Sequence, residues 1–187
     1  MAKATNALTQ GLSGKVTGLV FRHNANGTVS VGDAPRPSSK APTAAALAQR
    51  QRFQQAAFYG RAVQADPAQQ AAYATGIDAN SQSAYVVAVA DYLNAPNIVS
   101  VDFSAYRGAV GDAIVVQATD YFAVHHVHIR IQHPTGVVVE EGDATPDPDG
   151  YTFRYATTAK NASFPGDKII VSAYDNPGNE TTQQKIL

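Results

Sequence analysis

Runs in which apolar and polar residues alternate fill the second half of the chain, from residue 98 to residue 187. Because the side chains of a β-strand point alternately to its two faces, each run predicts a strand with one buried face. Clusters of Gly, Pro, Asn and Asp separate the runs, and about seven short strands joined by such turns are typical of a β-sandwich. The predicted inward positions are Val99, Val101, Phe103, Ile114, Val116, Ala118, Val127, Ile129, Ile131, Tyr151, Phe153, Tyr155, Ile169, Val171 and Ala173.

Residues 43–93 have their apolar side chains at helical spacing instead. Thr43 is a suitable N-cap for the first helix, and Asp66 followed by Pro67 is a typical start for the second. Three helices are therefore expected, over 44–65, from 67 to about 76, and from 80 or 81 to 93. Their predicted packing positions are Ala46, Phe53, Ala57 and Gly60 on the first helix and Tyr85, Val86, Val89 and Leu93 on the third.

The N-terminal part carries a hairpin signal. Residues of high β-propensity lie on both sides of Asn26-Gly27, a pair that favours a tight hairpin turn, so strands are expected at 15–22 and 28–32. The proline-rich segment 34–42 follows as an extended linker. The chain is thus predicted to be a mixed α and β protein in two parts: a hairpin, linker and helical region over 1–95, and a β-sandwich over 96–187.

The composition of the chain limits its stabilising chemistry and its cellular location. The chain has no cysteine, which excludes disulfides and thiolate metal sites. The first ten residues show no apolar signal-peptide region, and the longest apolar run, 85–90, is far shorter than the ~20 residues that a membrane span requires. We therefore expect a protein without a membrane span, located in the cytoplasm or in a released particle.

The charges of the chain are divided unevenly along it. Residues 1–61 hold eight basic residues and one acidic residue, a net charge of +7, whereas residues 62–187 hold six basic and fourteen acidic residues, a net charge of −8. Opposite charges on two parts of one chain favour association between chains. The basic residues are spread over a hairpin, a linker and a helix without an aromatic platform, which argues against nucleic acid as the partner.

Two groups of residues are candidate metal ligands. His126 and His128 lie two apart in a predicted strand, so their side chains share a face at about 7 Å. They would need a third ligand from another strand, and their alternation with inward Val127 also fits the outer half of a plain strand. Asp143, Asp147 and Asp149 form an acidic loop that offers oxygen ligands of the kind calcium prefers, but at a spacing unlike an EF-hand. We predict no cofactor and no metal.

Catalytic patterns are missing from the sequence. Glu140 and Glu141 are adjacent in a predicted strand, so they point to opposite faces and do not form an acid–base pair. No serine lies in a G-x-S-x-G context. Asp175 and Asn179 are interpreted as turn formers. The chain is therefore not expected to be an enzyme.

Two resemblances add to this picture. The segments G-D-A-I-V-V-Q-A-T-D, V-H-I-R-I, G-V-V-V-E-E-G-D-A and A-Y-D-N-P-G-N-E-T within 99–186 resemble bacterial immunoglobulin-like modules of adhesins and surface proteins, which implies an immunoglobulin-like β-sandwich. The glycine-rich start at 11–22, the proline-rich linker and A-L-A-Q-R-Q-R-F at 46–53 are similar to uncharacterised bacterial and phage-borne proteins with a G-K-V-x-G strand and a Q-x-x-R-x-x-F helix. The second resemblance implies a link to phage-like or secreted particles.

We therefore expect a non-enzymatic structural or assembly subunit that associates with copies of itself or packs into a larger particle, in a phage-like, injection-system or filament setting. The alternative is a ligand-binding or adhesion module that holds carbohydrate or calcium with its sandwich loops. The predicted assembly interface consists of Lys15, Val16, Leu19, Val20, Phe21, Arg22, Arg50 and Phe53. A head-to-tail contact, basic part against acidic part, would build rings or filaments.

Overall fold

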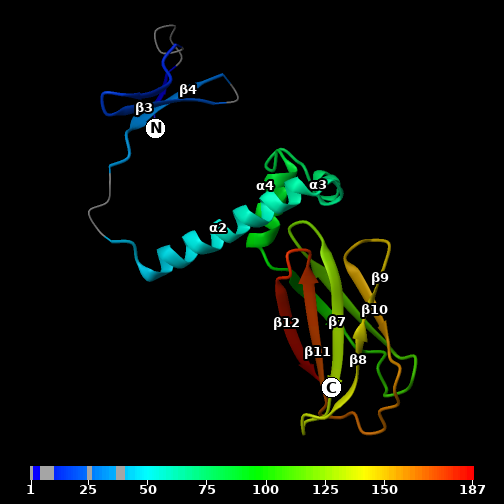
Figure 1. Cartoon of the computed structure of the whole chain (residues 1–187). Coiled ribbons are helices and arrows are strands. Elements are labelled where there is room, and N and C mark those ends of the chain that lie inside the picture. Colours follow the sequence, from blue (N-terminus) through cyan, green and yellow to red (C-terminus); the bar gives the residue numbers. More distant parts are fainter. Residues whose placement is uncertain (1, 5–10, 25–26, 37–40) are drawn as a thin grey trace. The chain divides into compact units, whose positions relative to one another are not determined.

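The computed structural model describes residues 2–4, 11–24, 27–36 and 41–187, and it confirms the mixed α and β composition (Figure 1). Contacts divide the chain into two compact units, Met1–Thr43 and Ala44–Leu187. The predicted boundary at 95/96 therefore falls inside the second unit. Among the residues described, no helix combines the length and apolar character required to cross a bilayer.

The N-terminal unit is an antiparallel sheet. Its strand order is β1 (Ala2–Ala4), β4 (Val29–Asp33), β3 (Leu19–His23) and β2 (Gly14–Val16). The predicted pairing around Asn26-Gly27 is confirmed as β3 with β4, although residues 25–26 lie outside the described part. The single strand expected over 15–22 is wrong, because a turn divides it into β2 and β3. Thr17 and Gly18 both have positive φ, 45° and 85°, which suits a tight two-residue hairpin turn.

The second unit begins with three helices: α2 (Ala44–Ala65), α3 (Pro67–Ala74) and α4 (Ala84–Leu93). Asp66 caps α3 as expected, since its side chain accepts hydrogen bonds from the backbone N–H groups of Ala68 and Gln69. The helix α4 begins later than predicted, because Ser83 is its N-cap and accepts from the N–H of Val86.

The packing faces of α2 and α4 agree only in part with those predicted. On α2 the buried residues are Ala56, Gly60 and Val63, whereas Phe53 is 55% exposed. At Gly60 the two helices approach so closely that an added Cβ would lie 2.8 Å from the ring of Tyr85. The buried stripe of α4 consists of Ala84, Val87, Ala88, Val89 and Asp91. Val89 is buried as predicted, whereas Val86 is 40% exposed and Asp91, which the prediction did not include, lies on the buried stripe.

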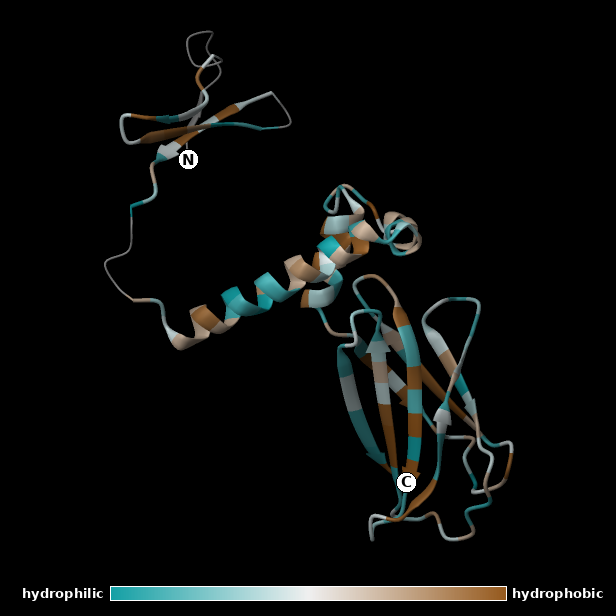
Figure 2. Cartoon of the chain, viewed as in Figure 1, coloured by the Kyte–Doolittle hydropathy of each residue, from teal (hydrophilic) through white to brown (hydrophobic). Residues whose placement is uncertain are grey.

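Residues 97–186 form two antiparallel four-stranded sheets, which we call the two-sheet region (Figure 1). One sheet has the order β5 (Asn97–Asp102), β6 (Ala113–Thr119), β10 (Thr152–Ala156) and β9 (Thr145–Pro146). The other has the order β12 (Glu180–Ile186), β11 (Lys168–Asp175), β7 (Val124–Gln132) and β8 (Val138–Asp143). The hydropathy colouring in Figure 2 shows apolar and polar residues alternating along these strands.

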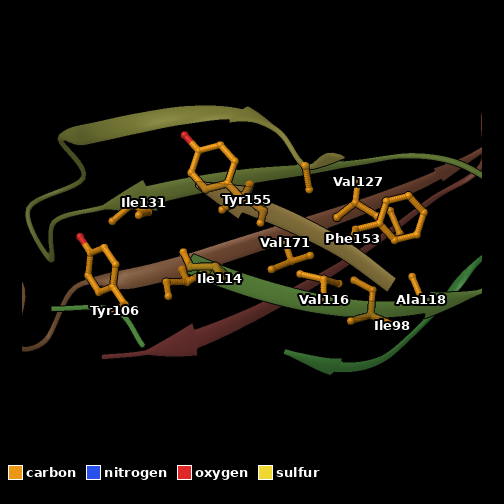
Figure 3. Packing of buried hydrophobic residues seen from close by; sticks show 14 residues of the cluster. Ile98, Tyr106, Ile114, Val116, Ala118, Val127, Ile131, Phe153, Tyr155 and Val171 are labelled. Atoms are coloured by element: carbon orange, nitrogen blue, oxygen red, sulfur yellow. The ribbon is translucent and has the colours of Figure 1, made fainter. Parts of the chain in front are cut away.

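The two sheets share one hydrophobic core (Figure 3). It contains Ile114, Val116, Ala118, Phe153 and Tyr155 from one sheet and Val127, Ile129, Ile131, Ile169, Val171 and Ala173 from the other, as the alternation predicted. Two inward predictions are wrong: Val99 and Tyr151 are exposed. At Val99 the pairing register shifts between Ile98 and Ser100, and this irregularity places Ile98 rather than Val99 in the core.

Several contacts join the helices to the two-sheet region. The ring of Tyr73 in α3 stacks on Phe122, between β6 and β7, with 4.5 Å between centroids. Asn179, before β12, donates from Nδ2 to the carbonyl oxygen of Tyr92 at 3.2 Å. Ser81 Oγ and Tyr121 Oη lie 2.5 Å apart. These contacts explain why residues 44–187 form one unit, and independent folding of 96–187 stays a prediction.

Candidate functional site

The N-terminal sheet has one mainly apolar face and one basic face. Residues directly opposite each other in neighbouring strands share a face. The register pairs Val16 with Leu19 and Phe21 with Val31, which places these four residues together on one face. The other face carries Lys15, Val20, Arg22 and Ser30, since Lys15 pairs with Val20 and Arg22 with Ser30.

The apolar face of this sheet is partly exposed. Val16 is 42% exposed and Leu19 is 40% exposed. Among residues 11–24 and 27–36, Val29 is the single buried residue, and it lies on this same face. The sheet therefore combines one buried apolar side chain with exposed apolar surface at Val16 and Leu19.

The residues predicted as an assembly interface belong to both units. Lys15, Val16, Leu19, Val20, Phe21 and Arg22 lie in or beside the strands β2 and β3 of the N-terminal sheet. Arg50 and Phe53 lie in the first half of α2, in the second unit, where both are exposed. That half of α2 contains no buried residue, whereas Leu47 and Phe53 are exposed large apolar side chains.

The two candidate histidines lie on the outer face of β7. His126 stacks on Tyr174 of β11, with 4.5 Å between ring centroids and 11° between the planes. His128 Nδ1 lies 2.8 Å from Asp143 Oδ1 on the neighbouring strand β8. Both histidines therefore have partners from adjacent strands, and Val127 between them is fully buried.

The three acidic loop residues do not converge. Asp143 pairs with His128, as above, and Asp147 accepts from Arg154 Nε at 2.8 Å. Asp149 accepts from the backbone N–H groups of Tyr151 and Thr152, and these hydrogen bonds, with that of the Thr152 hydroxyl, hold its pKa below the usual value. Each carboxylate is used locally to fix a strand pair or a turn.

A different set of carboxylates does converge, at the end of the two-sheet region that faces the helices. Asp91 lies on α4, Asp120 directly follows β6, and Asp175 ends β11. One oxygen from each lies within 4.8 Å of the others. Asp91 is completely buried and Asp175 is 2% exposed. At this separation two ionised carboxylates repel each other by about 3 kcal/mol at an effective dielectric constant of about 20.

Hydrogen bonds hold two of these three carboxylates in place. Tyr73 donates to Asp91 Oδ2 at 2.6 Å, and because its proton is used there, Tyr59 donates to Tyr73 at 2.8 Å. Asn179 donates to Asp175 twice, from its backbone N–H to Oδ1 and from Nδ2 to Oδ2, both at 2.6 Å. The interpretation of Asp175 and Asn179 as turn formers is thus confirmed, but Asp175 also faces the two other acids.

The pKa values reflect this crowding. Burial, together with the charges of Asp120 and Asp175, raises the pKa of Asp91 to about 7, although the hydrogen bond from Tyr73 favours its ionised form. Burial also raises the pKa of Asp120. One feature of the sequence points to this site: Asp91 lies on the apolar stripe of α4, where an unpaired acidic residue is costly.

No protein-family model matches this chain, and a search of curated proteins finds no match. Function is therefore inferred from the geometry and the charges of the chain itself.

Proposed function

We propose that the protein is a non-enzymatic assembly subunit whose N-terminal sheet docks onto another copy of the chain. The observation that carries this proposal is the partly exposed apolar face of that sheet, on which Val16 and Leu19 are exposed while Phe21 and Val31 are half-buried. A small sheet with one buried side chain among residues 11–24 and 27–36 has little to stabilise it alone, because burial of apolar surface is the main driving force of folding. Docking against a partner supplies that burial.

The charges of the two units favour a second copy as the partner. Residues 1–43 hold five basic residues and one acidic residue, a net charge of +4, whereas residues 44–187 hold nine basic and fourteen acidic residues, a net charge of −5. Such complementarity mainly raises the association rate and selects the orientation, while apolar burial supplies most of the affinity. The contact is heterologous, so it builds a ring where it closes and a filament where it does not.

We further propose that the two-sheet region is an immunoglobulin-like module that each subunit displays. Its strand order supports this assignment. In chain order its strands correspond to A, B, C, C′, D, E, F and G, so that β5-β6-β10-β9 matches the A-B-E-D sheet and β12-β11-β7-β8 matches G-F-C with an added strand. A phage-like, injection-system or filament particle is the setting that fits such repeated display.

The proposal is tested by removing apolar character from the docking face without damaging the sheet. Leu19 lies directly opposite Asp33, so Leu19→Lys replaces an exposed apolar side chain and adds a favourable cross-strand charge pair. Val110→Lys is the matched control, since Val110 is 64% exposed in the second unit. Sedimentation velocity should show assembly weakened about tenfold or more by Leu19→Lys, because burying one leucine contributes about 1.5–3 kcal/mol.

The control variant should assemble like the unchanged protein. Raised salt should slow assembly more than it dissolves the finished product, because charges act chiefly on the encounter. Unchanged assembly in Leu19→Lys would refute the proposed docking face.

A further inference from the structure

We propose that Asp91, Asp120 and Asp175 bind one Ca²⁺ ion at the junction between helix α4 and the two-sheet region. The three carboxylates come from separate segments, namely α4, the residue after β6, and the end of β11, and one oxygen of each lies within 4.8 Å of the others. This site is independent of the assembly proposed above and uses none of the acidic residues of the 143–149 loop.

Unpartnered buried oxygens are the observation that points to a cation. Asp91 is completely buried, yet its Oδ1 has no hydrogen-bond partner in the part of the chain that the structure describes. Both carboxylate oxygens of Asp120 are likewise inaccessible; the N–H group of Tyr121 and the carboxylate of Asp91 lie near them, but neither makes a well-aligned hydrogen bond with them. Buried polar atoms in folded proteins nearly always have a partner. Three such oxygens in one cluster, with two negatively charged neighbours each, call for a positive charge among them.

The donor set and its spacing suit calcium. All three ligands are carboxylate oxygens, which hard cations prefer, and Ca²⁺ binds oxygen at about 2.3–2.6 Å in flexible geometry. Two oxygens on opposite sides of such an ion are about 4.6–5.2 Å apart, so the observed limit of 4.8 Å fits within one coordination shell. Mg²⁺ binds at about 2.0–2.1 Å in strict octahedra, a geometry that three carboxylates on separate segments meet less readily than the flexible shell of Ca²⁺.

The ligands are oriented by groups around them, as in established metal sites. Tyr73 holds Asp91 through Oδ2 and leaves Oδ1 for the ion. Asn179 holds Asp175 through both oxygens, each of which keeps a further lone pair. A pocket of about 330 Å³ is lined in part by Tyr73, which donates to Asp91, and by Asn176, the neighbour of Asp175.

A bound ion would fasten the helices to the two-sheet region. Asp91 is the contribution of the helices, and the other two ligands belong to the sheets. Calcium should therefore stabilise the unit that spans 44–187 as a whole. The competing arrangement is a proton shared between Asp91 and Asp120, which would satisfy two of the oxygens without any metal.

The test uses the full chain, stripped of metal with a chelator and titrated with CaCl₂. Calorimetry should show one Ca²⁺ per chain, and the melting temperature should rise with Ca²⁺ until the site is saturated. Tb³⁺ should give tyrosine-sensitised emission that Ca²⁺ displaces, because Tyr73 donates directly to a ligand. Asp120→Asn is the informative variant, since it removes one of the three converging charges and keeps the size of the side chain.

Asp120→Asn should weaken Ca²⁺ binding at least about tenfold, since even groups that only orient a ligand change affinity about 10–100-fold. Asp143→Asn removes the same charge on the outer face of β8 and should leave Ca²⁺ binding unchanged. Asp175→Asn serves as a second variant if the first does not fold. A melting temperature that does not change when Ca²⁺ is added would overturn the proposal in favour of the shared proton. Binding of Mg²⁺ but not Ca²⁺ would overturn the assignment of the ion.

Discussion

The N-terminal sheet and the two-sheet region are built from the same kind of strand, but they solve the problem of burial differently. The two-sheet region turns the apolar faces of its sheets toward each other and buries fourteen core residues between 98 and 173. The N-terminal sheet also carries an apolar face, but among residues 11–24 and 27–36 only Val29 is buried. Under the proposal made above, the first region is stable by its own contacts, while the second gains its burial from another copy of the chain.

This difference shows what an alternating pattern means. Alternation specifies that one face of a strand avoids water, but it leaves open whether the covering surface comes from the same chain. In the N-terminal sheet the apolar pairs Val16 with Leu19 and Phe21 with Val31 are as well formed as the pairs of the core. In the proposed assembly, another copy of the chain supplies the covering surface.

The largest expected difference between the two regions is in the cooperativity with which their separate fragments unfold. The core cluster lies entirely within residues 98–173, so a fragment of 96–187 should unfold cooperatively with a β-type circular dichroism spectrum. A fragment of 1–43 should show no cooperative transition. A fragment of 44–187, which keeps the helices, is the control. A non-cooperative melt of 96–187 would mean that the helices are needed to fold the two sheets.

The general fold was predictable from the sequence because its signals are local. The helix over 44–65, the cap at Asp66 and the inward residues of β6, β7 and β11 follow directly from spacing and capping rules. The strand break at Thr17-Gly18 and the irregularity at Val99 were not predicted. Both depend on the local backbone conformation, which the pattern of apolar residues does not indicate.

The convergence of Asp91, Asp120 and Asp175 could not be predicted in the same way. These residues are 29 and 55 positions apart in sequence, and each belongs to a different element. Their proximity results from the packing of α4 against the ends of two strands in different sheets. The histidines and the loop acids were candidate ligands because they are close in sequence. Closeness in sequence does not indicate that side chains converge in space.

Glu140 and Glu141 are adjacent in β8, and substituting each one compares the contribution of a buried carboxylate to stability with that of an exposed one. Glu140 is 7% exposed, and its Oε2 accepts from Tyr155, from the N–H and hydroxyl of Thr158, and from the N–H of Ala159. Glu140→Ala should lower the free energy of unfolding by about 1–3 kcal/mol, because the donors lose their acceptor.

Glu141→Ala is the matched control for that substitution. Glu141 points outward and pairs with Arg130 across the strands. Exposed ion pairs contribute about 0–1 kcal/mol, so the change in a urea titration should stay within that range. Equal effects of the two substitutions would contradict the assignment of Glu140 as a buried acceptor.

The smallest effect is expected at the histidines of β7. The double substitution His126→Ala with His128→Ala changes the outer face of a strand whose inner face is fully buried. Each exposed substitution usually changes stability by about 0.5 kcal/mol or less, so the melting temperature should move little and the metal content should not change. Stoichiometric zinc in the purified protein that disappears in the double variant would show these residues to be a metal site.

The mass of the full-length protein in solution tests the assembly proposal most directly. Light scattering over a concentration series at low salt should show a species much larger than the 19.7 kDa monomer. A fragment of 34–187, which lacks the N-terminal sheet, should remain monomeric under the same conditions. Full-length protein that stays monomeric at high concentration and low salt would contradict the account, and a fragment that assembles like the full chain would place the interface outside the N-terminal sheet.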